Sequence, residues 1–176
     1  MDWKASHLCH FYKTKEELLR EVALFVSHGL DAGEAGLWVV PESLFSIDTA
    51  RQELTRWVTN LNGLERAGAM VFSTQREWYI PDGRFNLRRN YRNARAAERD
   101  ARMLGFRGLR ASADLSWIPE HLWPKVIHFE QRINHTLHYS RITALCTYDV
   151  TRCRPSMILE LLNHHTKLVT EHPIVV

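Results

Sequence analysis

The sequence has few cysteines, little excess charge and no long apolar run. Its 176 residues include three cysteines, Cys9, Cys146 and Cys153, and an odd number without regular spacing argues against a disulfide scaffold. No apolar stretch approaches the roughly 20 residues that span a bilayer, and the N-terminus lacks the apolar core of a signal peptide. We therefore expect a cytoplasmic protein without a membrane partner.

The charges nearly cancel, with 23 basic and 20 acidic residues and a formal net charge of +3. Such a balance leaves little field to hold a polyanion, so direct binding of nucleic acid is not expected. The densest basic stretch, Arg84–Arg102, also carries Glu98 and Asp100 at helical spacing, which is typical of a solvated helix face.

Apolar segments of strand length alternate with segments of helical periodicity. This pattern predicts one α/β domain over residues 1–176, with a mostly parallel sheet of about five strands and helices on both faces. The predicted strands are His7–Phe11, Leu37–Val40, Met70–Ser73, Arg107–Ala113 and Ile142–Tyr148.

The helices between these strands have clear start and stop signals. Thr14 is expected to cap the first helix, with Glu17 closing a capping box. One helix is predicted from Ile47 to Leu61, and another from about Leu87 to Leu104. Pro119 and Pro155 are suited to the first turns of two later helices, while a loop is expected to hold Trp78 and Tyr79.

Glu130 falls inside the apolar stripe of the helix that follows Pro119. A buried carboxylate is costly unless it is paired or hydrogen-bonded. We therefore expect Glu130 to be at least partly buried next to a hydrogen-bond donor, such as an arginine, a tryptophan N–H or a ligand.

In an open parallel sheet, ligands bind outside the carboxyl ends of the strands. Aromatic residues dominate the loops predicted at that edge, and aromatics with a few polar groups are typical of a small-molecule pocket. The predicted ligand-binding residues are His10, Phe11, Tyr12, Trp78, Tyr79, Asp114, Trp117, Glu130 and Tyr148. No catalytic constellation can be assembled from the sequence, so neither an enzyme nor a cofactor is expected.

A nucleotide is the first ligand to test. Lys13-Thr14 mimics the end of a phosphate-binding loop, and Asp114 could mimic an acidic residue that helps to hold magnesium. No glycine occurs before Gly29, however, and backbone amides need glycines to wrap closely around phosphates. A nucleotide-binding switch is therefore the alternative and not the main hypothesis.

His7-x-Cys9-His10 has the residue types of a metal site. Alternation along one strand points His7 and Cys9 to one face and His10 to the other, so these three residues cannot bind one ion. Cys146 or the pair His164-His165 would have to contribute. We expect packed cysteines and hydrogen-bonded histidines, and no metal.

Several segments, in this order and at this spacing, resemble the DcmR sensory (MEDS) family from about Ser6 to about Pro173. They are His7-Leu-Cys-His-Phe-Tyr12, Glu77-Trp-Tyr79 with Gly83-Arg-Phe85, Gly105-Phe-Arg-Gly-Leu-Arg110 with Ser116-Trp117, and Ala144-Leu-Cys-Thr-Tyr-Asp149. One difference is Ala113, where the family pattern commonly has glycine.

The resemblance implies a RecA/KaiC-like three-layer fold whose phosphate-binding loop has degenerated. It also implies a domain that senses hydrocarbon derivatives or small metabolites in bacterial or archaeal signal transduction or transcription regulation. The sequence shows neither a DNA-binding nor a kinase module, so we expect a regulatory protein partner to supply the output. The chain could also form a homodimer. A further alternative function is a protein-interaction module that binds no ligand, in which the protein's own side chains would fill the crevice.

The missing glycine loop generates the first prediction. Millimolar ATP with magnesium should give no thermal shift and no hydrolysis above that of a Lys13→Ala control, because no glycine cradle can surround the phosphates. Differential scanning fluorimetry and a phosphate-release assay check this. A shift that disappears in the Lys13→Ala variant would favour the nucleotide switch instead.

Overall fold

A single parallel sheet forms the centre of the protein. The computed structural model describes residues 6–137 and 139–169. The strands follow the order β3-β2-β4-β5-β1-β6, and every neighbouring pair is parallel. Their bounds are β1 (Ser6–Tyr12), β2 (Ala35–Val40), β3 (Met70–Thr74), β4 (Leu109–Asp114), β5 (Ile142–Asp149) and β6 (Lys167–Leu168).

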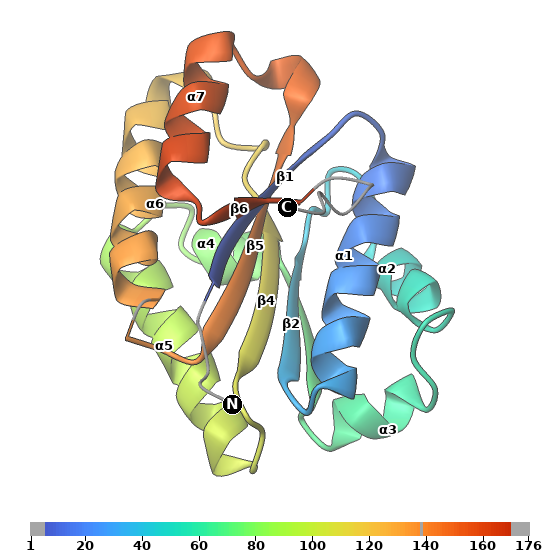
Figure 1. Cartoon of the computed structure of the whole chain (residues 1–176). Helices are drawn as coiled ribbons and strands as arrows, with labels where there is room; N and C mark the ends of the chain where they lie inside the picture. The colour runs from blue at the N-terminus through green and yellow to red at the C-terminus, as the bar shows by residue number, and fades with distance from the viewer. Residues whose placement is uncertain (1–5, 138, 170–176) are drawn as a thin grey trace.

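Helices cover both faces of this sheet, so the predicted three-layer α/β sandwich is confirmed (Figure 1). One face carries α1 (Lys15–Asp31), α2 (Ile47–Leu54) and α3 (Leu61–Arg66). The other carries α4 (Gln75–Tyr79), α5 (Leu87–Met103), α6 (Trp123–Leu137) and α7 (Pro155–His164). Short 3₁₀ turns lie at Glu120–Leu122 and Val150–Arg152. Within the described residues, no helix combines the length and the apolarity needed to cross a membrane.

Alternation along the strands divides the interior into two cores. In β2, Leu37 and Val39 pack toward α5 and α6, whereas Trp38 and Val40 pack toward α1 and α2. Every residue of this strand is buried, as a strand covered on both faces requires. We call the two sides of the sheet the α5/α6 face and the α1/α2 face.

Some predicted elements need correction. The helix predicted from Ile47 to Leu61 ends at Leu54, and a second helix, α3, begins at Leu61 directly after Asn60, whose left-handed φ of 56° a right-handed helix cannot contain. Trp57, which lies between the two helices, is 45% exposed. The predicted loop around Trp78 contains the short helix α4, and the sheet has six strands because the two-residue strand β6 adds to the predicted five.

Asp114 ties together the carboxyl ends of the central strands. Its buried carboxylate accepts hydrogen bonds from the Tyr12 hydroxyl at 3.0 Å, from the backbone N–H and hydroxyl of Ser116 at 3.1 Å, and from the Thr147 hydroxyl at 3.3 Å. The Gln75 amide donates to the Asp114 carbonyl at 3.1 Å. These contacts join β1, β4, β5 and the start of α4, and they hold together the carboxyl edge of the sheet.

Asp114 should give the protein a distinctive pH dependence. Burial raises the pKa of Asp114 from its ordinary 3.8 to about 6, although the hydrogen bonds from Tyr12, Ser116 and Thr147 lower it. Because the folded state then holds the proton more tightly than the unfolded state, the stability from protonated Asp114 is complete below about pH 4 and is lost as the pH rises through 6. The loss should reach about 3 kcal/mol.

Asp114→Asn cannot titrate, so the difference in unfolding free energy between the wild type and this variant should change across that pH window. Urea unfolding of both proteins between pH 4 and pH 7 measures the difference. A difference that is constant over the window would show that Asp114 is ionised in the folded protein throughout.

Candidate functional site

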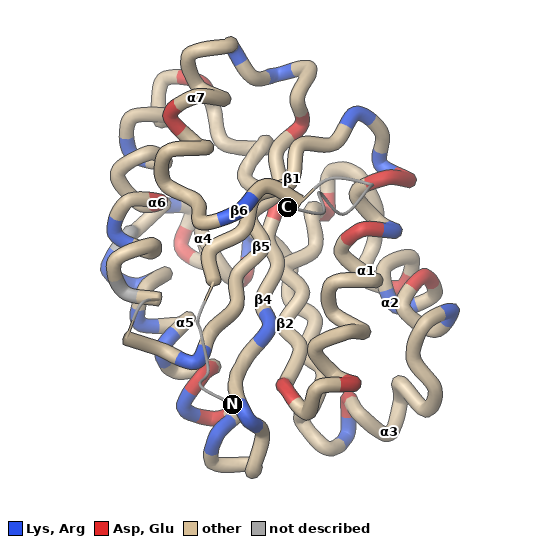
Figure 2. The backbone as a smooth tube through the Cα atoms, in the orientation of Figure 1, with Lys and Arg blue, Asp and Glu red and all other residues tan. Residues whose placement is uncertain are grey.

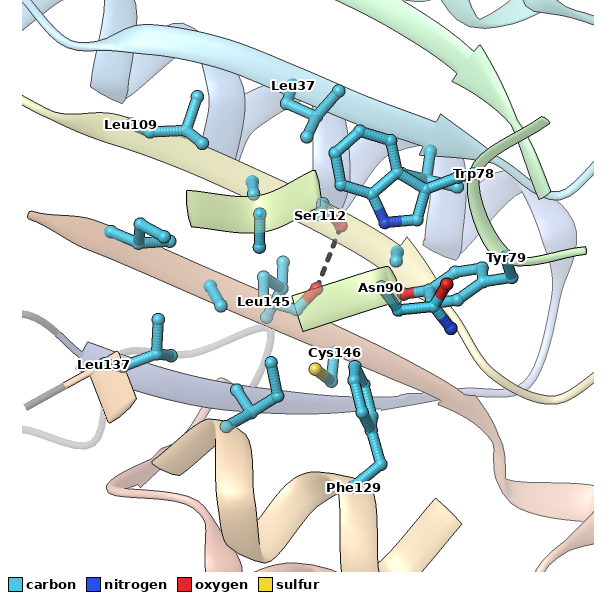
Figure 3. A pocket seen from close by; sticks show the side chains of 17 residues that line it. Leu37, Trp78, Tyr79, Asn90, Leu109, Ser112, Phe129, Leu137, Leu145 and Cys146 are labelled. Carbon is cyan, nitrogen blue, oxygen red and sulfur yellow. Dashed lines mark hydrogen bonds between the residues drawn. The ribbon is translucent and has the colours of Figure 1, made fainter. Parts of the chain in front are cut away.

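A small apolar cavity lies on the α5/α6 face of the sheet, between the strands and helices α5 and α6 (Figure 3). Its volume is about 60 Å³. The sheet leaves this room because the inward positions of β4 and β5 carry Ala111, Ala113 and Ala144, and Ala94 faces them from α5. Alanines at strand positions are too small to fill the space between a sheet and two helices.

Asn90 supplies a polar group in the cavity wall. The residue is only 1% exposed, and neither its amide nitrogen nor its amide oxygen has a hydrogen-bond partner among the described residues. The neighbouring Ser112 hydroxyl is satisfied, since it donates to the Leu145 carbonyl at 3.1 Å (Figure 3). Leaving a buried amide unpaired costs about 1 to 3 kcal/mol, so this side chain destabilises the folded protein unless another molecule pairs with it.

Aromatic rings close one end of the cavity. Trp78 and Tyr79 from α4 line it, together with Phe129 from α6. The Tyr79 ring lies 6.1 Å from Trp117, 5.9 Å from Phe85 and 6.4 Å from Phe129, measured between ring centroids. These contacts make the aromatic end a connected group in which each ring restrains the next.

A second polar group lies beside the cavity, and we call it the Glu130 cluster: His7, Glu130, Cys146 and His165. Glu130 is 0% exposed, and its Oε2 lies 3.0 Å from Nε2 of His7 and 3.5 Å from Nε2 of His165. The Cys146 Sγ lies 3.4 Å from the same His7 nitrogen. Cys146 also lines the cavity, so the two features share a wall.

Burial and charge act against each other in this cluster. Burial opposes ionisation of Glu130, but the contact with His7 and the charges of His7 and His165 outweigh it and lower the pKa of the carboxyl. Burial lowers the pKa of His165 to about 4. Burial, followed by the charge of Glu130, raises the pKa of the Cys146 thiol well above 9. The Glu130 carboxylate therefore dominates the electrostatics of the cluster.

The structure divides the predicted site residues between two faces. Trp78 and Tyr79 line the cavity, and Trp117 contacts Tyr79 at its edge. Tyr12 packs in the core of the α1/α2 face instead, so the predicted aromatic residues do not all share one crevice. His10 also differs: its Nδ1 hydrogen-bonds the Val169 carbonyl at 3.0 Å.

The remaining predicted residues lie at intermediate positions. Phe11 and Tyr148 pack together beside the cluster, with ring centroids 5.6 Å apart. The Asp114 carboxylate is occupied by the hydrogen bonds that tie the strand ends. The predicted burial of Glu130 is confirmed, and its neighbour is a histidine nitrogen, a partner that the sequence had not suggested.

Sequence reasoning missed Asn90 because it lies in the basic stretch that was interpreted as a solvated helix face. A signal was present in the small residues of that helix. Asn90, Ala94, Ala97 and Ala101 recur at helical spacing, and the three alanines pack against the core of the α5/α6 face. A stripe of small residues with one amide indicates the face of the helix that is turned toward the sheet.

The N-terminus of α1 is capped by the Thr14 side chain and carries acidic residues in its first turn. The Glu17 backbone N–H donates to the Thr14 hydroxyl at 3.1 Å, and the Glu17 carboxylate accepts from the Lys13 backbone N–H at 2.8 Å. Thr14 therefore caps the helix as predicted, but the predicted capping box is incomplete, because the Glu17 carboxylate accepts from the Lys13 backbone N–H and not from that of Thr14. An acidic side chain at this point repels an anion that the helix dipole would otherwise attract.

Solved structures share this fold. A KaiC-like protein, PH0186, from Pyrococcus horikoshii OT3 aligns with a TM-score of 0.56 and 12% identity over 96% of this chain and 74% of its own. The flagellar accessory protein FlaH from Methanocaldococcus jannaschii aligns with a TM-score of 0.57 and 12% identity over 93% of this chain and 71% of its own. At this identity, the likeness shows the RecA/KaiC-like fold alone. No curated protein sequence matches this chain significantly.

A family profile provides the finer assignment. It matches residues 6–166, which include every strand except β6 and the residues of the cavity and the Glu130 cluster. Pro173, the end of the resemblance noted in the sequence, lies outside the described residues. The chain therefore belongs to the MEDS family, the methanogen/methylotroph, DcmR sensory domain.

Proposed function

We propose that this protein is a cytoplasmic sensor of a small organic molecule that binds in the cavity on the α5/α6 face, without chemical conversion. One observation carries the proposal: the buried Asn90 amide, which has no partner in the described structure, lines an otherwise largely apolar space. Such a group is expected where a ligand completes the hydrogen bonds. The sensory family to which the chain belongs supports this role.

The size of the cavity restricts the ligand. One water molecule needs about 10 to 15 Å³ of space, so a cavity of about 60 Å³ accommodates a molecule of only a few heavy atoms. A nucleotide is far larger. The size therefore favours a hydrocarbon derivative or a similarly small metabolite over the nucleotide alternative.

The wall chemistry restricts the ligand further. Leu37, Phe129 and Ile133 provide apolar contacts, so the body of the ligand is apolar. The Asn90 amide can donate through its nitrogen and accept through its oxygen. A compact molecule with one hydroxyl on an apolar body can pair with both groups of the amide, whereas one with a carbonyl or halogen substituent can accept from its nitrogen.

Helix α5 connects this cavity to the surface. Asn90 faces inward, while Arg88, Arg92 and Arg102 on the same helix are exposed. Figure 2 shows basic residues along this helix, with acidic and basic residues elsewhere spread over both helical layers. A ligand that engages Asn90 would change how α5 packs on the sheet, and this helix is where we propose that a regulatory protein partner detects the change.

The state of the cysteines supports the proposed cytoplasmic location. All three cysteines are free thiols. Cys9 is buried on β1 and Cys153 is half-buried, and burial raises the pKa of both, to about 12 and about 11. Unreactive thiols of this kind fit a cytoplasmic protein that performs no thiol chemistry.

The Asn90→Leu variant tests the function. Leucine has nearly the shape of asparagine without the unpaired amide, so the ligand-free variant should be more stable than the wild type by about 1 to 3 kcal/mol. It should also lose binding of small polar organic molecules. Thermal-shift titrations with short alcohols, ketones and halomethanes measure both effects.

Asn93→Leu is the matched control, since Asn93 lies one turn further along α5 and its amide donates to the Trp78 carbonyl at 3.5 Å. This variant should bind the same compounds as the wild type and gain no stability. If Asn90→Leu is destabilised, or if both variants bind equally well, the Asn90 amide has a structural role and the assignment is wrong.

A further inference from the structure

The Glu130 cluster brings one donor atom from each of four side chains together. The atoms from His7, Glu130, Cys146 and His165 all lie within 4.8 Å of one another. They come from β1, α6, β5 and the segment after α7, so the fold and not a local sequence motif assembles them. The side chains of His7, Glu130 and His165 are at most 1% exposed.

The tautomers of the two histidines are fixed by the backbone. Nδ1 of His7 lies 3.0 Å from the His164 carbonyl oxygen, and Nδ1 of His165 lies 2.6 Å from the Leu161 carbonyl oxygen. A carbonyl oxygen can only accept a hydrogen bond, so Nδ1 carries the proton in both rings. In each neutral imidazole, Nε2 therefore presents a lone pair, and both lone pairs point at the Glu130 carboxylate.

Lone pairs that face one another repel unless a cation lies between them. A proton on His7 would satisfy its 3.0 Å contact with Glu130 Oε2. It would leave Nε2 of His165 without a hydrogen bond from any described residue. A single central cation satisfies all four donors at once.

The donor spacing suits a tetrahedral metal ion. Zinc with bonds of about 2.0 to 2.3 Å holds its ligands about 3.3 to 3.8 Å apart. Within the cluster, His7 Nε2 lies 3.4 Å from Cys146 Sγ, and His165 Nε2 lies 3.5 Å from Glu130 Oε2. The shorter His7 to Glu130 distance of 3.0 Å needs only a small outward movement.

The charges and the surroundings agree with this assignment. A divalent cation, one carboxylate and one thiolate sum to zero, which removes the cost of burying a net charge. Histidine ligands characteristically donate their second ring N–H to a backbone carbonyl, as both histidines do here. The buried Tyr148 hydroxyl is a further donor at the cluster, since its hydrogen bond helps to lower the pKa of Glu130.

We propose that His7, Glu130, Cys146 and His165 form a metal site that takes zinc or a similar divalent transition-metal ion in a nitrogen, oxygen and sulfur ligand set. The site does not depend on what the neighbouring cavity binds. Cys146 belongs to both, so the ion would lie directly behind the cavity wall.

Metal analysis of the purified full chain, produced without a polyhistidine tag and stripped with a chelator, tests the site. Titration with Zn²⁺ should reach one equivalent per chain and should raise the melting temperature. Titration with Co²⁺ should give the visible d–d bands of a tetrahedral site together with a thiolate-to-cobalt charge-transfer band.

Matched variants locate the ligands. His165→Gln should weaken metal binding by more than about tenfold, the loss that follows removal of even an outer partner, whereas His164→Gln should bind like the wild type. Cys146→Ser should lose the charge-transfer band, whereas Cys153→Ser should keep it. Circular dichroism of each apo variant confirms that it is folded, and the cobalt spectrum of Glu130→Asp, which keeps a carboxylate, provides a second test should another variant fail to fold.

The proposal is overturned if the folded wild type takes up neither ion stoichiometrically. It is equally overturned if His164→Gln loses as much metal as His165→Gln and Cys153→Ser loses as much as Cys146→Ser.

Discussion

The Glu130 carboxylate is buried completely, and this single charge constrains the α5/α6 side of the molecule. Its cost in an apolar interior is large unless positive charge or hydrogen-bond donors surround it. His7 and His165 approach it from β1 and from the segment beyond α7, and each ring is held by a backbone carbonyl. The carboxylate thereby links the first strand, helix α6 and the C-terminal segment around one point.

Asp114 and Glu130 are both buried carboxylates, but they have opposite surroundings. Every described contact of Asp114 completes its hydrogen bonding, and the residue joins the strand ends as a structural element. Glu130 faces histidine lone pairs and a thiol, and nearby Asn90 faces an apolar cavity. Apart from Nε2 of His10, the unpartnered buried polar atoms of the described residues lie on the α5/α6 side, and such a concentration is the usual mark of a binding function.

The sequence predicted the fold well because its signals are local. Apolar runs such as Leu37–Val40 and the caps at Thr14 and Pro155 depend only on neighbouring residues, and five strands could be placed from them. The candidate site was harder to predict, because it depends on which face of the sheet each side chain reaches once the strands are assembled. Tyr12 ends β1 and Tyr79 ends the short helix after β3, at the same edge of the sheet, yet they belong to opposite cores. Likewise, no spacing in the sequence brings His7 beside His165.

Diffraction from a crystal pressurised with xenon tests most directly whether the α5/α6 face holds the ligand site, because xenon enters small apolar cavities without needing a specific polar partner. The account predicts a xenon atom in contact with Phe129 and Cys146 in the cavity beside Asn90, with the surrounding side chains unmoved. A cavity that is filled by its own side chains, or xenon bound only on the α1/α2 face around Trp38, would contradict it.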